Sequence, residues 1–128
     1  MTDGDLVAQV RARPGLYGLD GTYYQTVTFL TGVDIGRSGD LLRGFTEWMA
    51  VRKNEATSFN WIALVFEEAV PGAGLRNWKQ LEPHEDQKAV EGLFELLLEF
   101  VEMREDKEAF DRVYAQYQAL NAPHGKAG

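Results

Sequence analysis

The fold is decided by residues 83–103, which read Pro83-His-Glu-Asp-Gln-Lys-Ala-Val-Glu-Gly-Leu-Phe-Glu-Leu-Leu-Leu-Glu-Phe-Val-Glu-Met103. Pro83 suits the first turn of a helix, and acidic residues directly after it suit the positive end of the helix dipole. Apolar residues then recur at helical spacing in two stripes, which are Val90, Phe94, Leu97, Val101 and Leu96, Phe100, Met103. Because this apolar arc is wide, we expect the longest helix of the chain to lie centrally, with neighbours on both sides.

Shorter amphipathic segments surround this helix in the sequence. We expect a first helix to begin near Leu6 and to end before Pro14, because proline disfavours α geometry in the residue before it. Asp40 can cap a third helix and Ser58 a fourth, since both residue types favour helix N-caps. The charged run at 104–108 indicates either a bend or an exposed continuation into a last helix.

Residues 23–30 allow two interpretations. Thr22 and Gln25 have the spacing of a capping box, and Tyr23, Val27 and Leu30 share one helical face, which favours a second helix. Four threonines between residues 22 and 31 alternate partly with apolar residues, and β-branched residues favour strands. A short strand near 23–30 therefore stays open as the alternative.

The chain as a whole has the size and composition of one globular domain. It has 128 residues, of which 45% are hydrophobic and 26% charged, and it shows no internal repeat. We predict a mainly α fold, a compact bundle of about five or six helices around the long one. The domain should span residues 1–120, and residues 121–128 should form a flexible tail.

Charge and composition argue against several classes of partner. The formal net charge of −7 opposes binding to nucleic acid or to anionic lipid. No apolar run approaches the roughly 20 residues that cross a bilayer, and the N-terminus lacks the pattern of an export signal. The absence of cysteine suits a reducing cytoplasm, where we expect the protein to act.

Residues that commonly carry catalysis are few. The two histidines lack the i,i+3 or i,i+4 partners that metal sites on helices use, and no serine belongs to a recognisable nucleophile motif. We therefore expect no enzymatic activity, no metal and no cofactor.

One short motif stands out near the N-terminus, Arg11-Ala-Arg-Pro-Gly-Leu-Tyr-Gly18. It resembles a signature of type II topoisomerase ATPase subunits, but the catalytic glutamate and the magnesium-binding asparagine that follow it in that family are missing here. We interpret Arg13, Pro14, Gly15, Tyr17 and Gly18 as a structural turn that locks the first helix against the second. In this interpretation Gly15 takes a positive φ, and the Tyr17 ring is buried while its hydroxyl finds a partner.

The same turn, with tryptophan-containing segments near Glu47-Trp48 and Asn60-Trp61, resembles a group of small actinobacterial helical proteins. Several of these resemble immunity proteins of polymorphic-toxin systems. The resemblance implies a cytoplasmic protein that neutralises a cognate toxin by occluding its active surface.

Two features are candidates for partner binding. Glu91, Glu95, Glu99 and Glu102 fall within about a quarter of the helix circumference, so they form one acidic line on the long helix. This line could dock against a basic protein, or it could be an ordinary solvated face. Trp78 lies in the loop before Pro83, where it could anchor an interface or fold back onto the core.

The leading hypothesis is a non-enzymatic inhibitor, an immunity-type protein that covers the basic surface of a cognate bacterial toxin; a nuclease would suit the charge. The first alternative is a small enzyme or ligand-binding domain with an aromatic-lined pocket among Tyr17, Tyr23, Tyr24 and Trp61. The second is a homo-oligomer with a structural or regulatory role. Trp48 and Trp61 lie on apolar faces, and we expect both in the core.

Overall fold

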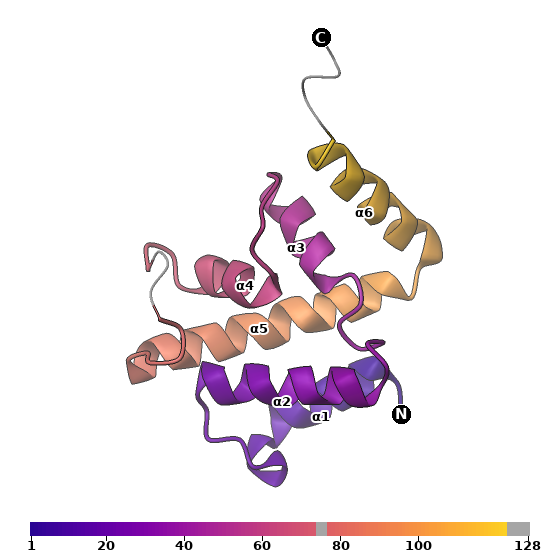
Figure 1. The fold of residues 1–128 in the computed structure, drawn as a ribbon. Helices are drawn as coiled ribbons and strands as arrows, with labels where there is room; N and C mark the ends of the chain where they lie inside the picture. Colours follow the sequence, from indigo (N-terminus) through magenta and orange to yellow (C-terminus); the bar gives the residue numbers. More distant parts are fainter. Residues whose placement is uncertain (74–76, 123–128) are drawn as a thin grey trace.

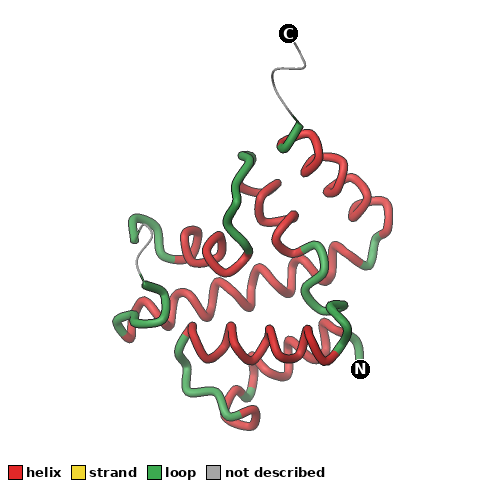
Figure 2. Tube along the Cα trace, in the orientation of Figure 1, coloured by secondary structure: helices red, strands yellow, loops and turns green. Residues whose placement is uncertain are grey.

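A computed structural model describes residues 1–73 and 77–122, and all regular structure within these ranges is helical (Figures 1 and 2). The elements in chain order are α1 (Asp3–Ala12), the 3-10 helix η1 (Pro14–Tyr17), α2 (Tyr23–Gly36), α3 (Phe45–Lys53), α4 (Trp61–Ala69), α5 (Pro83–Arg104) and α6 (Lys107–Leu120). The predicted helical bundle around a long helix is therefore confirmed.

Helix α5 runs through the middle of the molecule. In Figure 1, α1 and α2 lie on one side of it, and α3 and α4 lie on the other. Helix α6 packs on α3 and on the end of α5 and extends away from the rest of the bundle (Figure 1). The apolar side chains that α5 buries come from both predicted stripes and from the positions between them, namely Ala89, Leu93, Phe94, Leu96, Leu97, Phe100 and Val101. Neighbours on both sides of α5 thus explain its wide apolar arc.

The aromatic part of the core gathers around Phe45. Its ring centroid lies 5.2 Å from that of Phe100, 5.6 Å from Trp61 and 6.1 Å from Trp48. Both tryptophans are buried, as predicted from their positions on apolar faces. Helices α3, α4 and α5 are therefore joined by one aromatic cluster.

Residues 23–30 belong to α2, so the alternative of a short strand is wrong. The Thr22 hydroxyl caps the helix by accepting a hydrogen bond from the Gln25 backbone N–H. The hydroxyls of Thr26 and Thr28 donate to carbonyls four residues earlier, at 2.8 Å in both cases. Threonines that bond back in this way fit a helix, which removes the main argument for a strand.

Two predicted caps are wrong, because other residues perform that role. Helix α3 begins at Phe45 instead of Asp40, after Gly44 in the left-handed region at φ 90°. A Cβ at Gly44 would lie 2.6 Å from the Phe110 ring, so close packing and backbone conformation both favour glycine there. Helix α4 is capped by Asn60 instead of Ser58, and the Asn60 side chain accepts from two backbone N–H groups.

The remaining helix ends agree with the sequence in part. Helix α1 starts at Asp3, before the expected Leu6, because Thr2 and Asp5 form a complete capping box. The charged run after α5 forms a bend, and Asp106 caps α6. Of the predicted tail, residues 123–128 lie outside the described part of the chain. Helices of the length and apolarity needed to cross a membrane are not found in the described residues.

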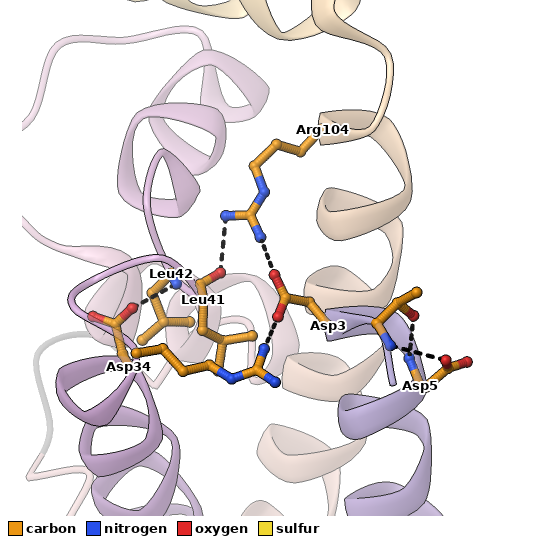
Figure 3. A network of polar contacts seen from close by, with 8 residues as sticks. Asp3, Asp5, Asp34, Leu41, Leu42 and Arg104 are labelled. Carbon is orange, nitrogen blue, oxygen red and sulfur yellow. Dashed lines mark hydrogen bonds and ion pairs between the residues drawn. The ribbon is translucent and has the colours of Figure 1, made fainter.

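A polar network ties the start of α1 to the ends of α2 and α5 (Figure 3). The Asp3 carboxylate pairs with Arg37 at the end of α2 and, at 3.0 Å, with Arg104 at the end of α5. The Arg104 guanidinium also donates to the carbonyls of Leu41 and Arg43, at 2.9 and 3.0 Å. Burial lowers the pKa of Arg104, and the nearby charge of Arg43 adds to this effect. The mostly buried Arg104 guanidinium donates three hydrogen bonds, one to Asp3 and two to backbone carbonyls. The network is therefore a structural junction of the fold.

Candidate partner-binding surface

The four glutamates of the predicted line are all exposed on α5. We call Glu91, Glu95, Glu99 and Glu102 the acidic stripe. The side chains of Glu95 and Glu99 keep 68% and 59% of their surface exposed. A partner could therefore reach these carboxylates without any movement of the fold.

Two carboxylates of the stripe lie in intramolecular ion pairs. Glu95 lies 3.8 Å from the Arg11 guanidinium of α1, and Glu99 lies 3.8 Å from that of Arg52 in α3. Arg52 has a closer partner in Glu68, at 2.7 Å. Exposed pairs of this kind typically contribute only about 0–1 kcal/mol, so cations of a partner could replace them at little cost.

The negative charges at the two ends of the stripe are less neutralised by nearby cations of the described residues than those in its middle. Glu91 accepts a hydrogen bond of 3.3 Å from the Gln87 side chain, which carries no charge. Glu102 has no ion pair with any residue of the described ranges. Negative charge on this face is thus reduced in the middle of the stripe and retained at both ends.

The predicted turn between the first two helices is present in a modified form. Pro14 opens η1, and Gly18, instead of Gly15, takes the positive φ of 74°. Gly15 lies inside the 3-10 helix that proline initiates, and so its backbone conformation is helical. The Tyr17 hydroxyl donates to the side chain of Gln9 in α1 at 3.3 Å.

The Tyr17 ring completes the link between helices. It is half-buried and packs edge-on against Phe29 of α2, at a centroid distance of 5.7 Å. Since Gln9 belongs to α1 and Phe29 to α2, one side chain contacts both helices. Tyr17 therefore links α1 and α2 through one hydrogen bond and one ring contact.

The turn and the acidic stripe meet at a hollow of about 360 Å³, which we call the Glu91–Glu95 hollow. Its lining residues come from α1, the turn, α2 and α5, and they are Arg11, Pro14, Leu19, Gly21, Thr26, Val90, Glu91, Phe94 and Glu95. Most of the wall is apolar, while two carboxylates and one guanidinium supply its charge. Sequence reasoning found the turn and the stripe but not their contact, because their elements are far apart in the chain.

Trp78 folds back against the bundle. It is half-buried, and its ring lies edge-on to those of Tyr23 and Tyr24, at centroid distances of 6.0 and 5.8 Å. The Lys79 ammonium lies over the Tyr24 and Trp78 rings, at 5.4 and 5.6 Å. The exposed surface beside Trp78 therefore belongs mainly to Tyr24, which is 46% exposed, and to Lys79.

The four aromatic residues of the alternative pocket do not gather around one cleft. Tyr23 is fully buried, its hydroxyl donates to the Ile62 carbonyl at 2.6 Å, and burial raises its pKa. Trp61 belongs to the core, Tyr17 packs on α2, and Tyr24 packs on Trp78. A larger hollow of about 580 Å³ lies between the ends of α3 and α6, and among the described residues that line it only Glu55 is ionisable.

In the described residues, 1–73 and 77–122, histidine and carboxylate side chains form no group of three that could hold a metal ion. No family model, curated protein or solved structure matches the chain. The fold and the surface define the chain as an all-helical bundle with an exposed acidic face on its central helix.

Proposed function

We propose that this chain is a non-enzymatic, immunity-type inhibitor that acts in the cytoplasm and binds a cognate protein toxin through the acidic stripe. One observation carries the proposal: four exposed carboxylates lie on one face of the central helix, and their ion pairs within the chain are long and exposed. The partner is expected to present lysines and arginines. A nuclease fits this description, because its working surface must attract phosphate backbones.

The charge of the molecule supports this mode of binding in two ways. The net charge of −7 accelerates the encounter with a basic surface, and an acidic patch orients that encounter. The backbone that carries the stripe is held by the many buried side chains of α5, so binding needs no ordering of that backbone. Trp78, with Tyr24 beside it, is a second contact of the same proposal.

The test first identifies any toxin encoded by a neighbouring gene and then measures its association with this chain. Reversing both central charges, Glu95→Lys with Glu99→Lys, should lower the association rate constant about tenfold at low salt and weaken its salt dependence. The matched control is Glu105→Lys with Asp111→Lys, which changes net charge equally at exposed positions outside the stripe. Co-expression should also restore growth of cells that produce the toxin.

The two variants separate a local effect from a general one. A smaller effect of the control than of the stripe variant supports the stripe as the interface. Equal association kinetics for the wild type and the stripe variant would reject it. A neighbouring toxin that neither binds the chain nor is neutralised by it would reject the proposed function itself.

A further inference from the structure

We infer that the Glu91–Glu95 hollow is a socket for one arginine side chain of a protein partner. The inference rests on the proposed function, because it names the chemical group that the acidic stripe receives. Three observations carry it: the volume and apolar lining of the hollow, two carboxylates in that lining, and a guanidinium that already lies there.

The hollow combines an apolar wall with two carboxylates. At about 360 Å³ it falls within the ~300–1,000 Å³ that is typical of ligand pockets. Leu19, Val90 and Phe94 offer apolar surface from different elements. Arginine and lysine bury their methylene stems along such surface while the charged head stays near water.

The two carboxylates lie about one helical turn apart on one face of α5. Glu91 and Glu95 are four residues apart on α5, which places their Cβ atoms about 5–6 Å from each other on one face. A guanidinium has five donors in a rigid plane, so it can donate to two carboxylates at once, whereas an ammonium is a compact and more strongly hydrated charge. The spacing therefore favours arginine over lysine.

Arg11 is the internal competitor for the same position. Its guanidinium lies 3.8 Å from Glu95 and lines the hollow, which places a guanidinium beside this carboxylate in the free protein. The side chain is 43% exposed, so it can move aside. Removing its charge should make the hollow more negative and improve the binding of an external cation.

The experiment titrates 1-butylguanidinium into the isotopically labelled full chain and follows backbone amide shifts by NMR. Shifts are expected at Gly21, Glu91 and Glu95, with a dissociation constant in the millimolar range. Glu91→Gln with Glu95→Gln should weaken binding about fivefold, since each exposed charge contact contributes up to ~1 kcal/mol. Arg11→Gln should tighten binding about twofold.

The matched control variant is Glu99→Gln with Glu102→Gln, which removes equal charge from the same helix outside the hollow. It should change the affinity less than twofold. The control probes are butylurea, which has a similar shape without charge and should not bind measurably, and butylammonium, which should bind more weakly than butylguanidinium. Circular dichroism and urea midpoints establish that each variant folds.

Three results would overturn the socket. These are equal weakening by the two glutamine variants, equal binding of butylammonium, and shifts located away from the hollow. Failure of the socket would not by itself reject the proposed function. If the variant with Glu95→Lys and Glu99→Lys associates more slowly with the toxin, that result would still support the acidic stripe as the interface. Probe binding as described, without any toxin binding, would instead retain the hollow as a guanidinium site and reject the inhibitor.

Discussion

At the scale of single residues, Gly92 sets the distance between α4 and α5. A Cβ built at Gly92 would lie 2.7 Å from the Cβ of Ala69, closer than two carbon atoms that are not bonded to each other normally approach. Gly92→Ala must therefore push α4 away from α5, and we expect it to lower the free energy of unfolding by about 1–3 kcal/mol, which is typical of overpacking. Urea denaturation followed by circular dichroism measures the change.

The chain contains a matched control for this substitution. Gly32 lies within α2, and a Cβ there would meet nothing within 4 Å. Gly32→Ala should raise the free energy of unfolding by about 0.5–1 kcal/mol, because alanine loses less backbone entropy in a helix. If the Gly92 variant were as stable as the Gly32 variant, the close approach of α4 and α5 would be wrong.

Residue-scale predictions from sequence succeeded where the deciding interaction is local. Thr22 and Pro83 could be assigned to helix starts, because a cap depends on the next three residues. Asp40 failed as a cap because a distant contact helps to decide where α3 starts: a Cβ at Gly44 would meet the Phe110 ring. Ser58 failed because Asn60, two residues later, is the local cap of α4, and the Trp61 backbone N–H donates to the distant Thr46 hydroxyl at 3.0 Å.

At the scale of elements, Asp3 holds three helix ends together (Figure 3). Its carboxylate is 28% exposed, whereas the Arg104 side chain that it contacts is only 10% exposed. Asp3→Asn removes the carboxylate that pairs with Arg104, while the bonds from Arg104 to the Leu41 and Arg43 carbonyls remain. We expect the free energy of unfolding to fall by about 1–3 kcal/mol, because a hydrogen bond to a charged group typically contributes about 1.5–3 kcal/mol.

The control for Asp3 is Asp111→Asn on the exposed face of α6, which removes the same charge and should change stability by less than about 0.5 kcal/mol. Thermal and urea unfolding of both variants give the comparison. Equal stability of the two variants would mean that the network adds nothing to the fold.

Sequence periodicity predicted the elements well and their contacts poorly. The two stripes of α5 identify the helix and its central place, because an apolar arc of that width must be covered on both sides. The polar network around Asp3 has no comparable periodic pattern in the sequence. Arg37 and Arg104 are far apart in the sequence, and only the folded chain brings them to one carboxylate.

At the scale of the whole molecule, the distribution of charge matters more than its sum. The acidic stripe could be identified from α5 alone, since helical geometry fixes which glutamates share a face. The partial neutralisation of the stripe by positive charge could not be identified in this way, because Arg11 and Arg52 reach the stripe from α1 and α3. The Glu91–Glu95 hollow escaped prediction for the same reason: four elements line it.

The proposed function requires that the ion pairs of the stripe are weak, and stability measurements at low salt can test this. Glu95→Gln with Glu99→Gln removes two exposed pairs, each worth about 0–1 kcal/mol, and relieves repulsion of about 0.2–0.5 kcal/mol for each neighbouring pair of glutamates. These effects nearly cancel. We therefore expect a change in the free energy of unfolding of less than about 1 kcal/mol.

Glu91→Gln with Glu102→Gln is the matched variant for this measurement, because it removes equal charge from the same stripe without breaking an ion pair. The two variants should agree within about 1 kcal/mol in dilute buffer and converge in 1 M salt, where the Debye length is ~3 Å. A loss above about 2 kcal/mol in the Glu95 and Glu99 variant alone would assign these glutamates to the fold. Carboxylates needed to hold α1 and α3 in place would not be free to exchange partners, and the acidic stripe could not serve as the toxin-binding surface.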